Sequence, residues 1–250
     1  MSERNIEKYR ENYLALDFEN YQIIFRRKKV FERINLYKHD HLLEVGCGEK
    51  PLFDYFDDYK TMTIIEPDQY FVDTALSLSS GNKKISIIQG FLEENISQLK
   101  EKEYDLIIIS GLLHEVENPN KFLQCIKKLC SKNTVIHINV PNPHSFHRIL
   151  ALEMGLIENV YARSENMIRL GINNFFTLNS LKSTVEQLGF NILETGDYFL
   201  KPFSHSQMQR LLDIDLFDQN FLTGLYNITK YFPGMGSEIF IDCSISDNYL

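Results

Sequence analysis

The stretch that decides the fold is His41-Leu-Leu-Glu-Val-Gly-Cys-Gly-Glu-Lys-Pro51. Its short apolar segment, residues 42–45, predicts a strand, and the two glycines after it let the backbone turn sharply and approach a ligand. Twenty residues after Gly46, the segment Ile64-Ile-Glu-Pro-Asp68 puts Glu66 at the end of a second predicted strand. A carboxylate at that point can accept hydrogen bonds from the ribose hydroxyls of an adenosine. Together the two segments predict a βαβ unit that binds a nucleotide cofactor.

Pro51 narrows the choice of cofactor. A dinucleotide site ends its glycine-rich loop with a small residue, so that the next helix packs close to the strand and faces a pyrophosphate. Proline suits a first helical turn but does not supply that close packing. The chain also contains no G-x-x-x-x-G-K-[ST] motif, which excludes a P-loop. The sequence therefore favours an adenosine ligand without phosphates and opposes an NAD-type oxidoreductase.

The pattern E-V-G-C-G, followed by an acidic residue at the end of the next strand, resembles the class I S-adenosylmethionine-dependent methyltransferases over roughly residues 40–140. Residues 86–91 resemble the end of that family's third strand, beside the adenine, and residues 104–111 resemble its fourth strand. The run 112–119 is similar to the family's L-E-H-V-x-x-P signature, with His114 and Glu115 in reverse order. The family's common third glycine is replaced here by a lysine.

This resemblance implies S-adenosylmethionine as the methyl donor and S-adenosylhomocysteine as the product. Phe91 stands where the family often has an acidic adenine contact, which leaves that contact to the backbone and apolar packing. Matched position by position, the resemblance implies a cofactor site made by Glu44, Gly46, Cys47, Gly48, Glu66, Pro67, Phe91, Leu92 and Ser110.

Alternation of predicted strands and helices indicates the α/β class: a Rossmann-like, doubly wound, seven-stranded sheet, mostly parallel with an antiparallel last strand. Strands are expected near 41–45, 61–66, 84–88, 104–110, 133–140, 190–195 and 238–244. Helices are expected near 51–58, 68–79, 92–100, 118–131 and 177–189. Residues 1–36 predict a helical cap, and 37–250 a methyltransferase domain with helical insertions at about 141–176 and 201–236, the first of them a candidate lid.

Histidines near the predicted acceptor end suggest how a hydroxyl could be methylated. Such an acceptor reacts well only when a base removes its proton. His114, just past the fourth strand, is the first choice, with Glu115 beside it to contact the substrate. A second group follows the fifth strand: His144 and His147 as further candidate bases, and Asn142 and Arg148 as substrate contacts.

That second group, P-N-x-x-S-x-H-R, resembles a stretch of methyltransferases encoded with bacterial surface-polysaccharide genes. The resemblance implies O-methylation of a sugar or nucleotide-linked glycan precursor. An N-methyltransferase acting on a small amine or amide and a catalytically inactive cofactor-binding scaffold remain open alternatives. The sequence shows no dense cluster of acidic oxygen ligands near the expected acceptor end of the sheet, so a metal-assisted transfer is not predicted.

Composition sets further expectations. A formal charge of −8 disfavours a nucleic-acid partner, whose phosphates need a basic surface. No apolar run approaches the ~20 residues of a membrane span, and we expect a cytoplasmic protein whose four cysteines stay reduced. The aromatic residues between 217 and 232 fit a homodimer contact or a domain core equally well. The basic run 26–29 is interpreted as the solvated face of a helix.

Overall fold

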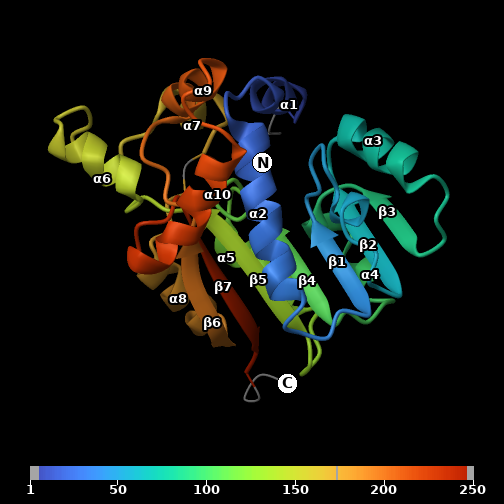
Figure 1. Cartoon of the computed structure of the whole chain (residues 1–250). Coiled ribbons are helices and arrows are strands. Elements are labelled where there is room, and N and C mark those ends of the chain that lie inside the picture. Colours follow the sequence, from blue (N-terminus) through green and yellow to red (C-terminus); the bar gives the residue numbers. More distant parts are fainter. Residues whose placement is uncertain (1–5, 173, 247–250) are drawn as a thin grey trace.

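A seven-stranded sheet forms the centre of the computed structural model, which describes residues 6–172 and 174–246 (Figure 1). The strand order is β3-β2-β1-β4-β5-β7-β6, and β7 alone runs antiparallel to its neighbours, β5 and β6. This confirms the predicted Rossmann-like sheet. The strands are β1 (His41–Val45), β2 (Thr61–Glu66), β3 (Ile85–Gln89), β4 (Leu106–Ser110), β5 (Val135–Pro141), β6 (Phe190–Tyr198) and β7 (Glu238–Ile245).

Helices cover both faces of the sheet, which explains why its central strands are apolar almost throughout. One core cluster joins α2 (Glu19–Ile34) and α3 (Gln69–Ser79) to β1, β2 and β4. Another joins α4 (Ile96–Leu99), α5 (Pro119–Lys127) and α8 (Leu178–Gln187) to the opposite face. In Figure 1, α2 crosses the face of the sheet nearest the viewer.

The helix expected near 51–58 is wrong: only a 3₁₀ turn, η1 (Leu52–Asp54), connects β1 to β2. Val30 and Ile34 of α2, in the N-terminal cap, are fully buried in the same cluster as Leu52 of η1. The helix expected near 92–100 is divided at Asn95 into η2 (Leu92–Glu94) and α4.

The cap and the insertions contribute the remaining helices, several of which lie at the end of the sheet where the parallel strands finish. These are α1 (Ile6–Leu14), α6 (Phe146–Glu153), α7 (Glu165–Arg169), α9 (His205–Asp213), α10 (Gln219–Ile228) and η3 (Thr229–Tyr231). Figure 1 shows α1, α7 and α9 together at the top of the molecule, whereas α10 lies beside α2. None of the helices in the described residues is both long and apolar enough to cross a membrane.

Candidate active site

A cavity of about 1680 Å³ opens at the carboxyl ends of β1, β2 and β4 and extends beneath the cap and the two insertions. Open α/β sheets bind ligands at this edge, because the loops after the parallel strands meet there. The cavity has two halves. The loops after β1, β2 and β3 line the first, which we call the cofactor half. The second, which we call the acceptor half, is lined by α2, α6 and the segment after β6.

The loop after β1 leaves room for a ligand because its glycines adopt conformations that other residues avoid. Gly46 and Gly48 have φ angles of 76° and 57°, in the left-handed region that favours glycine. A Cβ atom on Gly46 would lie 3.2 Å from the side chain of Leu112. Both glycines line the cavity, and their contact with a cofactor stays a prediction.

Glu66 lies at the end of β2 and faces this loop. Its carboxylate accepts hydrogen bonds from the backbone N–H groups of Gly48 at 3.2 Å and Asp68 at 3.0 Å. The side chain is 5% exposed, and burial raises the pKa of Glu66 to about 7. A ligand that donates hydroxyl hydrogen bonds to this carboxylate would favour its charged form.

The other residues of the predicted cofactor half also line the cavity, with one exception. Cys47, Pro67, Phe91, Leu92 and Ser110 all contribute to its wall. The Oγ atom of Ser110 is buried and has no hydrogen-bond partner among the described residues. An unpaired hydroxyl, a glycine loop and a buried carboxylate are groups that could bind an adenosine ligand.

Glu44 is the exception, and its predicted contact with the cofactor is corrected here. It does not line the cavity, because its carboxylate binds the Arg27 guanidinium at 2.8 Å and the backbone N–H of Leu52 at 2.9 Å. Arg27 also donates to the carbonyl oxygens of Cys47 and Lys50. Glu44 therefore supports the glycine loop from beneath.

The cap helix α1 covers the cavity and contacts both halves. The Tyr9 hydroxyl donates to Glu115 at 2.6 Å, and Arg10 pairs with Asp68 at 3.2 Å. Tyr13 lines the cavity next to the glycine loop, and burial raises the pKa of its hydroxyl. These contacts cross the boundary between cofactor and acceptor halves.

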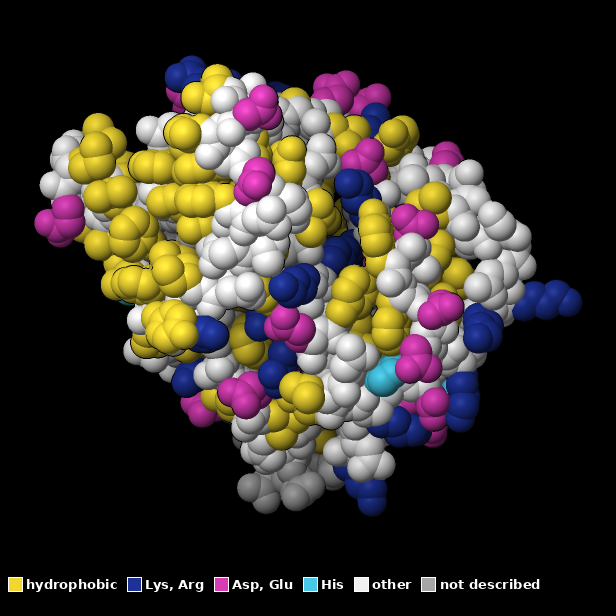
Figure 2. Space-filling model, in the orientation of Figure 1, with side chains coloured by type: hydrophobic (Ala, Val, Ile, Leu, Met, Phe, Trp, Pro, Cys, Tyr) yellow, Lys and Arg dark blue, Asp and Glu magenta, His cyan; other side chains and the backbone are white. Residues whose placement is uncertain are grey.

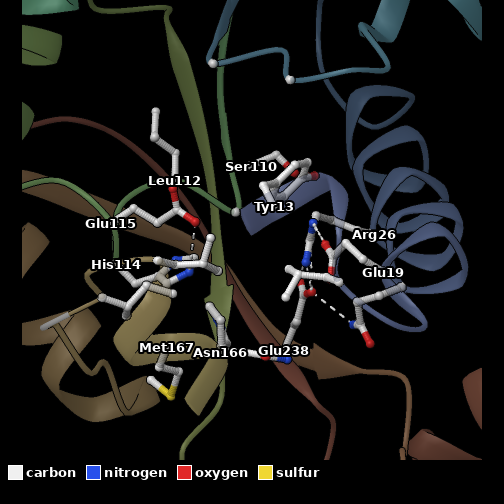
Figure 3. Close-up of a pocket in the computed structure, with 18 of the residues that line it drawn as sticks. Tyr13, Glu19, Arg26, Ser110, Leu112, His114, Glu115, Asn166, Met167 and Glu238 are labelled. Atoms are coloured by element: carbon white, nitrogen blue, oxygen red, sulfur yellow. Dashed lines mark hydrogen bonds and ion pairs between the residues drawn. The ribbon is translucent and has the colours of Figure 1, made fainter. Parts of the chain in front are cut away.

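His114 and Glu115 follow β4 on one side of the pocket, and both line the cavity (Figure 3). The Nε2 atom of His114 lies 3.8 Å from a carboxylate oxygen of Glu115. The histidine is buried, and Asn174 donates to its backbone carbonyl at 3.4 Å. A neutral imidazole in this position can accept a proton from a ligand in the cavity.

The group after β5 is divided by the structure: the predicted role of His144 is corrected, whereas Asn142 and Arg148 line the cavity and their contact with the substrate stays a prediction. His144 is exposed and lies outside the cavity wall, with its ring against Tyr161 of the first insertion. Asn142 lines the cavity, but its amide donates to the carbonyls of Gly234 and Gly236. Arg148 donates to the carbonyls of Val160 and Ala162, at 2.9 and 2.5 Å. These three residues hold the insertions in place.

His147 also lines the cavity, and its ring forms no hydrogen bond with the backbone of either insertion in the described part of the chain. Its Nδ1 atom lies 3.1 Å from the Ser145 hydroxyl. Burial, together with the nearby charge of Lys201, lowers the pKa of His147 well below its ordinary value. The ring is therefore neutral in the ligand-free protein at neutral pH.

A comparison with known protein families identifies the family of this chain. The methyltransferase-domain family matches residues 15–195, which is most of the chain and includes both the glycine loop and β4. This chain is an S-adenosylmethionine-dependent methyltransferase. A comparison with curated protein sequences found no significant match.

Solved structures show that the methyltransferase shares its fold with distant relatives. A methyltransferase from Thermotoga maritima, described as a possible histamine N-methyltransferase, is 13% identical, with a TM-score of 0.63 over 96% of each chain. The plantazolicin methyltransferase BpumL, solved with S-adenosylhomocysteine, is 18% identical, with a TM-score of 0.58 over 98% of this chain and 91% of that one. The [4+2]-cyclase SpnF is 13% identical, with a TM-score of 0.58 over 88% and 79%. A fold that serves a cyclase too does not by itself fix a reaction.

The methyltransferase also has a buried charged cluster that the sequence interpretation left out of the site. Arg26 of α2 lies against Gly111 and binds Glu238 of β7 through Nε and Nη2, at 3.0 and 2.6 Å. Its Nη1 atom binds Glu19 at 3.0 Å. Although burial alone would raise the pKa of Glu238, the charge and hydrogen bonds of Arg26 hold this pKa below its ordinary value.

The interpretation of the basic run as a solvated face is therefore wrong for Arg26 and Arg27, whose side chains are largely buried. In Figure 3, Arg26, Glu19 and Glu238 lie on the side of the pocket opposite His114, with Ser110 and Tyr13 between the two groups. Glu19, Gln22 and Arg26 share one face of a helix by their spacing of three and four residues. That spacing was the signal in the sequence that could have indicated a polar cluster on one face of this helix. Within the described residues, no group of three or more His, Cys, Asp or Glu side chains is arranged to hold a metal ion.

Proposed function

We propose that this methyltransferase transfers a methyl group to an oxygen of a small polar acceptor, such as a sugar or a nucleotide-linked glycan precursor. The observation that carries the proposal is the acceptor half of the cavity, where buried charged side chains face His114 across the pocket. Polar groups that are already buried and oriented bind a hydroxyl-rich ligand without further ordering. An apolar acceptor would form no hydrogen bonds with these groups.

The cofactor half has the residues to hold S-adenosylmethionine. Glu66 would accept hydrogen bonds from the ribose hydroxyls, and the glycine loop would allow the backbone to approach the ligand. Ser110 would supply a hydroxyl at the end of β4, between the two halves. When bound, the cofactor supplies an electrophilic methyl group on a sulfonium centre.

His114 is the proposed base. The proton of the acceptor hydroxyl would pass to the imidazole as the oxygen gains the methyl group, and Glu115 would stabilise the resulting imidazolium. Arg26 and Glu238 would orient the rest of the acceptor from the opposite wall. His147 remains a second candidate because it lines the same half of the cavity.

Methyl-transfer assays with isotope-labelled S-adenosylmethionine would test this proposal. The acceptor panel would contain nucleotide sugars, sugar phosphates and matched small amines. We expect labelled product from hydroxyl acceptors, with the methyl group located on oxygen by fragmentation mass spectrometry. Label transferred only to amines would contradict O-methylation.

N-methylation of a small amine is the second candidate, favoured by the carboxylates of Glu19 and Glu115 in the cavity wall. Either could bind an ammonium group. The Thermotoga maritima structure is described as a possible histamine N-methyltransferase, which agrees with this alternative but shares only the fold. A neutral amine needs no strong base, so the two candidates differ in how far His114→Ala lowers turnover.

We further propose a cytoplasmic enzyme that forms a homodimer. Figure 2 shows many hydrophobic side chains on the left flank of that view, over α6 and beside α10. Large exposed apolar residues in or next to these elements include Met154 of the α6 end, Ile214 and Phe221. An apolar area of this kind is typical of protein contacts. Light scattering after size-exclusion chromatography would test the dimer, and cell fractionation would test the compartment.

A further inference from the structure

Lys201 lies directly after β6 and lines the acceptor half of the cavity. Its side chain is only 4% exposed. No hydrogen bond or ion pair joins it to any part of the chain that the structure describes, unlike the neighbouring Arg26, which binds two carboxylates. A buried ammonium group without a partner is costly for a folded protein. Its position points to a ligand that would supply the missing partner.

Two histidines line the cavity near this lysine. His147 belongs to the first turn of α6, and His205 is the first residue of α9. Burial and the charge of Lys201 lower the pKa values of both rings well below the ordinary value. Burial also lowers the pKa of Lys201 to about 7. The three groups are thus close enough to oppose one another's protonation.

Glu19 and Glu238 face this cluster, and their negative charges favour the charged form of Lys201. Glu238 and Glu19 are already bound by Arg26, and Arg148 donates to two backbone carbonyls. Two helices, α6 and α9, begin beside the cluster, and the N-terminal end of a helix carries partial positive charge. Since neither carboxylate forms an ion pair with Lys201 among the described residues, the ammonium group and the two helix ends favour a negative ligand in direct contact.

We propose that the methyl acceptor carries an anionic group, a phosphate or a carboxylate, which binds among Lys201, His147 and His205 while the acceptor hydroxyl faces the methyl donor. This inference rests on the proposed function, since it concerns the acceptor of the same site. It adds a substrate class, because a neutral sugar would leave the lysine without its partner.

Anion binding should be linked to proton uptake. A nearby negative charge raises the pKa of Lys201 and of both histidines, so the empty site must gain protons when the anion binds near neutral pH. For a ligand of fixed charge, the affinity should fall as the pH rises through about 7, by about tenfold per pH unit for each proton taken up. A site whose groups do not titrate would show no such slope.

The experiment uses the full chain saturated with S-adenosylhomocysteine, so that the carboxylate of the cofactor cannot be the anion detected. Histidine ring protons are followed by NMR across a pH series, with sulfate, acetate or neutral acetamide present in turn. Sulfate represents a phosphoryl group and acetate a carboxylate, and His147→Asn and His205→Gln assign the two signals. Lys201→Met removes the charge at similar volume, and Lys132→Met, at an exposed position outside the cavity, is the matched control.

We expect one of the two anions to raise the midpoints of the His147 and His205 signals, and acetamide to leave them unchanged. Lys201→Met should weaken this binding by roughly 10-fold to 100-fold, whereas Lys132→Met should match the wild type. The stronger anion identifies the acceptor as phosphorylated or carboxylic. Equal binding to Lys201→Met, or no response to either anion in protein that holds the cofactor product, would overturn the inference while leaving methyl transfer intact. Failure to bind S-adenosylhomocysteine at all would instead count against the proposed function.

Discussion

Glu66 connects cofactor binding to protonation. Burial raises its pKa to about 7 in the ligand-free protein, so its carboxylate is partly protonated at neutral pH. Hydroxyl groups of a bound ribose would favour the charged form and expel that proton. S-adenosylhomocysteine should therefore bind at full strength above pH 7 and lose affinity as the pH falls through about 7, by up to about tenfold per unit.

Calorimetric titrations between about pH 6 and pH 8 would measure this slope. Glu66→Gln, which cannot ionise, should give weaker binding with a nearly flat profile. A wild-type profile as flat as that of the variant would contradict the proposed contact between Glu66 and the ribose.

His114 and His144 separate a catalytic role from a structural one. His114→Ala should lower turnover of a hydroxyl acceptor by about 10²-fold to 10⁴-fold, the usual contribution of a general base, and should leave cofactor affinity unchanged. His144→Ala, at an exposed position outside the cavity, should retain its turnover. Steady-state kinetics beside calorimetry would measure both effects. Normal turnover in His114→Ala would move the base to His147 or favour an amine acceptor.

At the residue scale, the sequence predicted cofactor-lining positions better than acceptor-binding ones. Gly46 follows β1, while Glu66 and Ser110 end β2 and β4, so the predicted strands and the family resemblance located them at one edge of the sheet. The acceptor half combines Arg26, Lys201 and Glu238, which come from three distant segments. Only tertiary packing brings these three residues together. The sequence interpretation instead chose Asn142 and Arg148 as substrate contacts because they lie close to the candidate histidines. The side chains of both donate hydrogen bonds to backbone carbonyls.

At the scale of single elements, α2 is tied to the glycine loop through Arg27. Its guanidinium binds Glu44 of β1, and both side chains are largely buried. Arg27→Met would leave the Glu44 carboxylate buried without its cation, which should lower the free energy of unfolding by about 3–5 kcal/mol. Urea unfolding followed by circular dichroism would measure the loss.

The double variant Arg27→Met/Glu44→Gln provides the control for this pair. Removing both charges should recover part of the lost stability, since the buried carboxylate is no longer ionised. Equal losses in the single and double variants would show that packing, and not the ion pair, links α2 to the loop.

The strands were predicted to within a few residues because their apolar runs are nearly continuous, as the two helical layers require. The helix expected after Pro51 was wrong for a reason that lies outside its own sequence. Val30 and Ile34 of α2 pack in the same buried cluster as Leu52 of η1, so distant residues complete the core at this turn. Competition between segments for one face is invisible to local pattern analysis.

At the scale of the whole molecule, the cap belongs to the core of the enzyme. Arg26 and Arg33 of α2 bind Glu238 and Asp242 of β7, more than 200 residues away, and Phe25 stacks on Phe199 at 4.5 Å between ring centroids. We therefore expect residues 1–36 and the methyltransferase domain to unfold together. Tyrosine fluorescence and far-ultraviolet circular dichroism should report a single coincident urea transition. Two separated transitions would show that the cap is an independent unit.

The most direct test of this account is a calorimetric titration of the purified protein with S-adenosylhomocysteine, with NAD as the control ligand and Glu66→Ala as the control variant. We predict stoichiometric binding of S-adenosylhomocysteine and no binding of NAD. Glu66→Ala should bind roughly 10-fold to 100-fold more weakly, the cost of losing hydrogen bonds to a charged group, while its thermal unfolding shows an intact fold. Folded wild-type protein that binds neither ligand, or a Glu66→Ala variant with unchanged affinity, would contradict the site proposed between the glycine loop and β2.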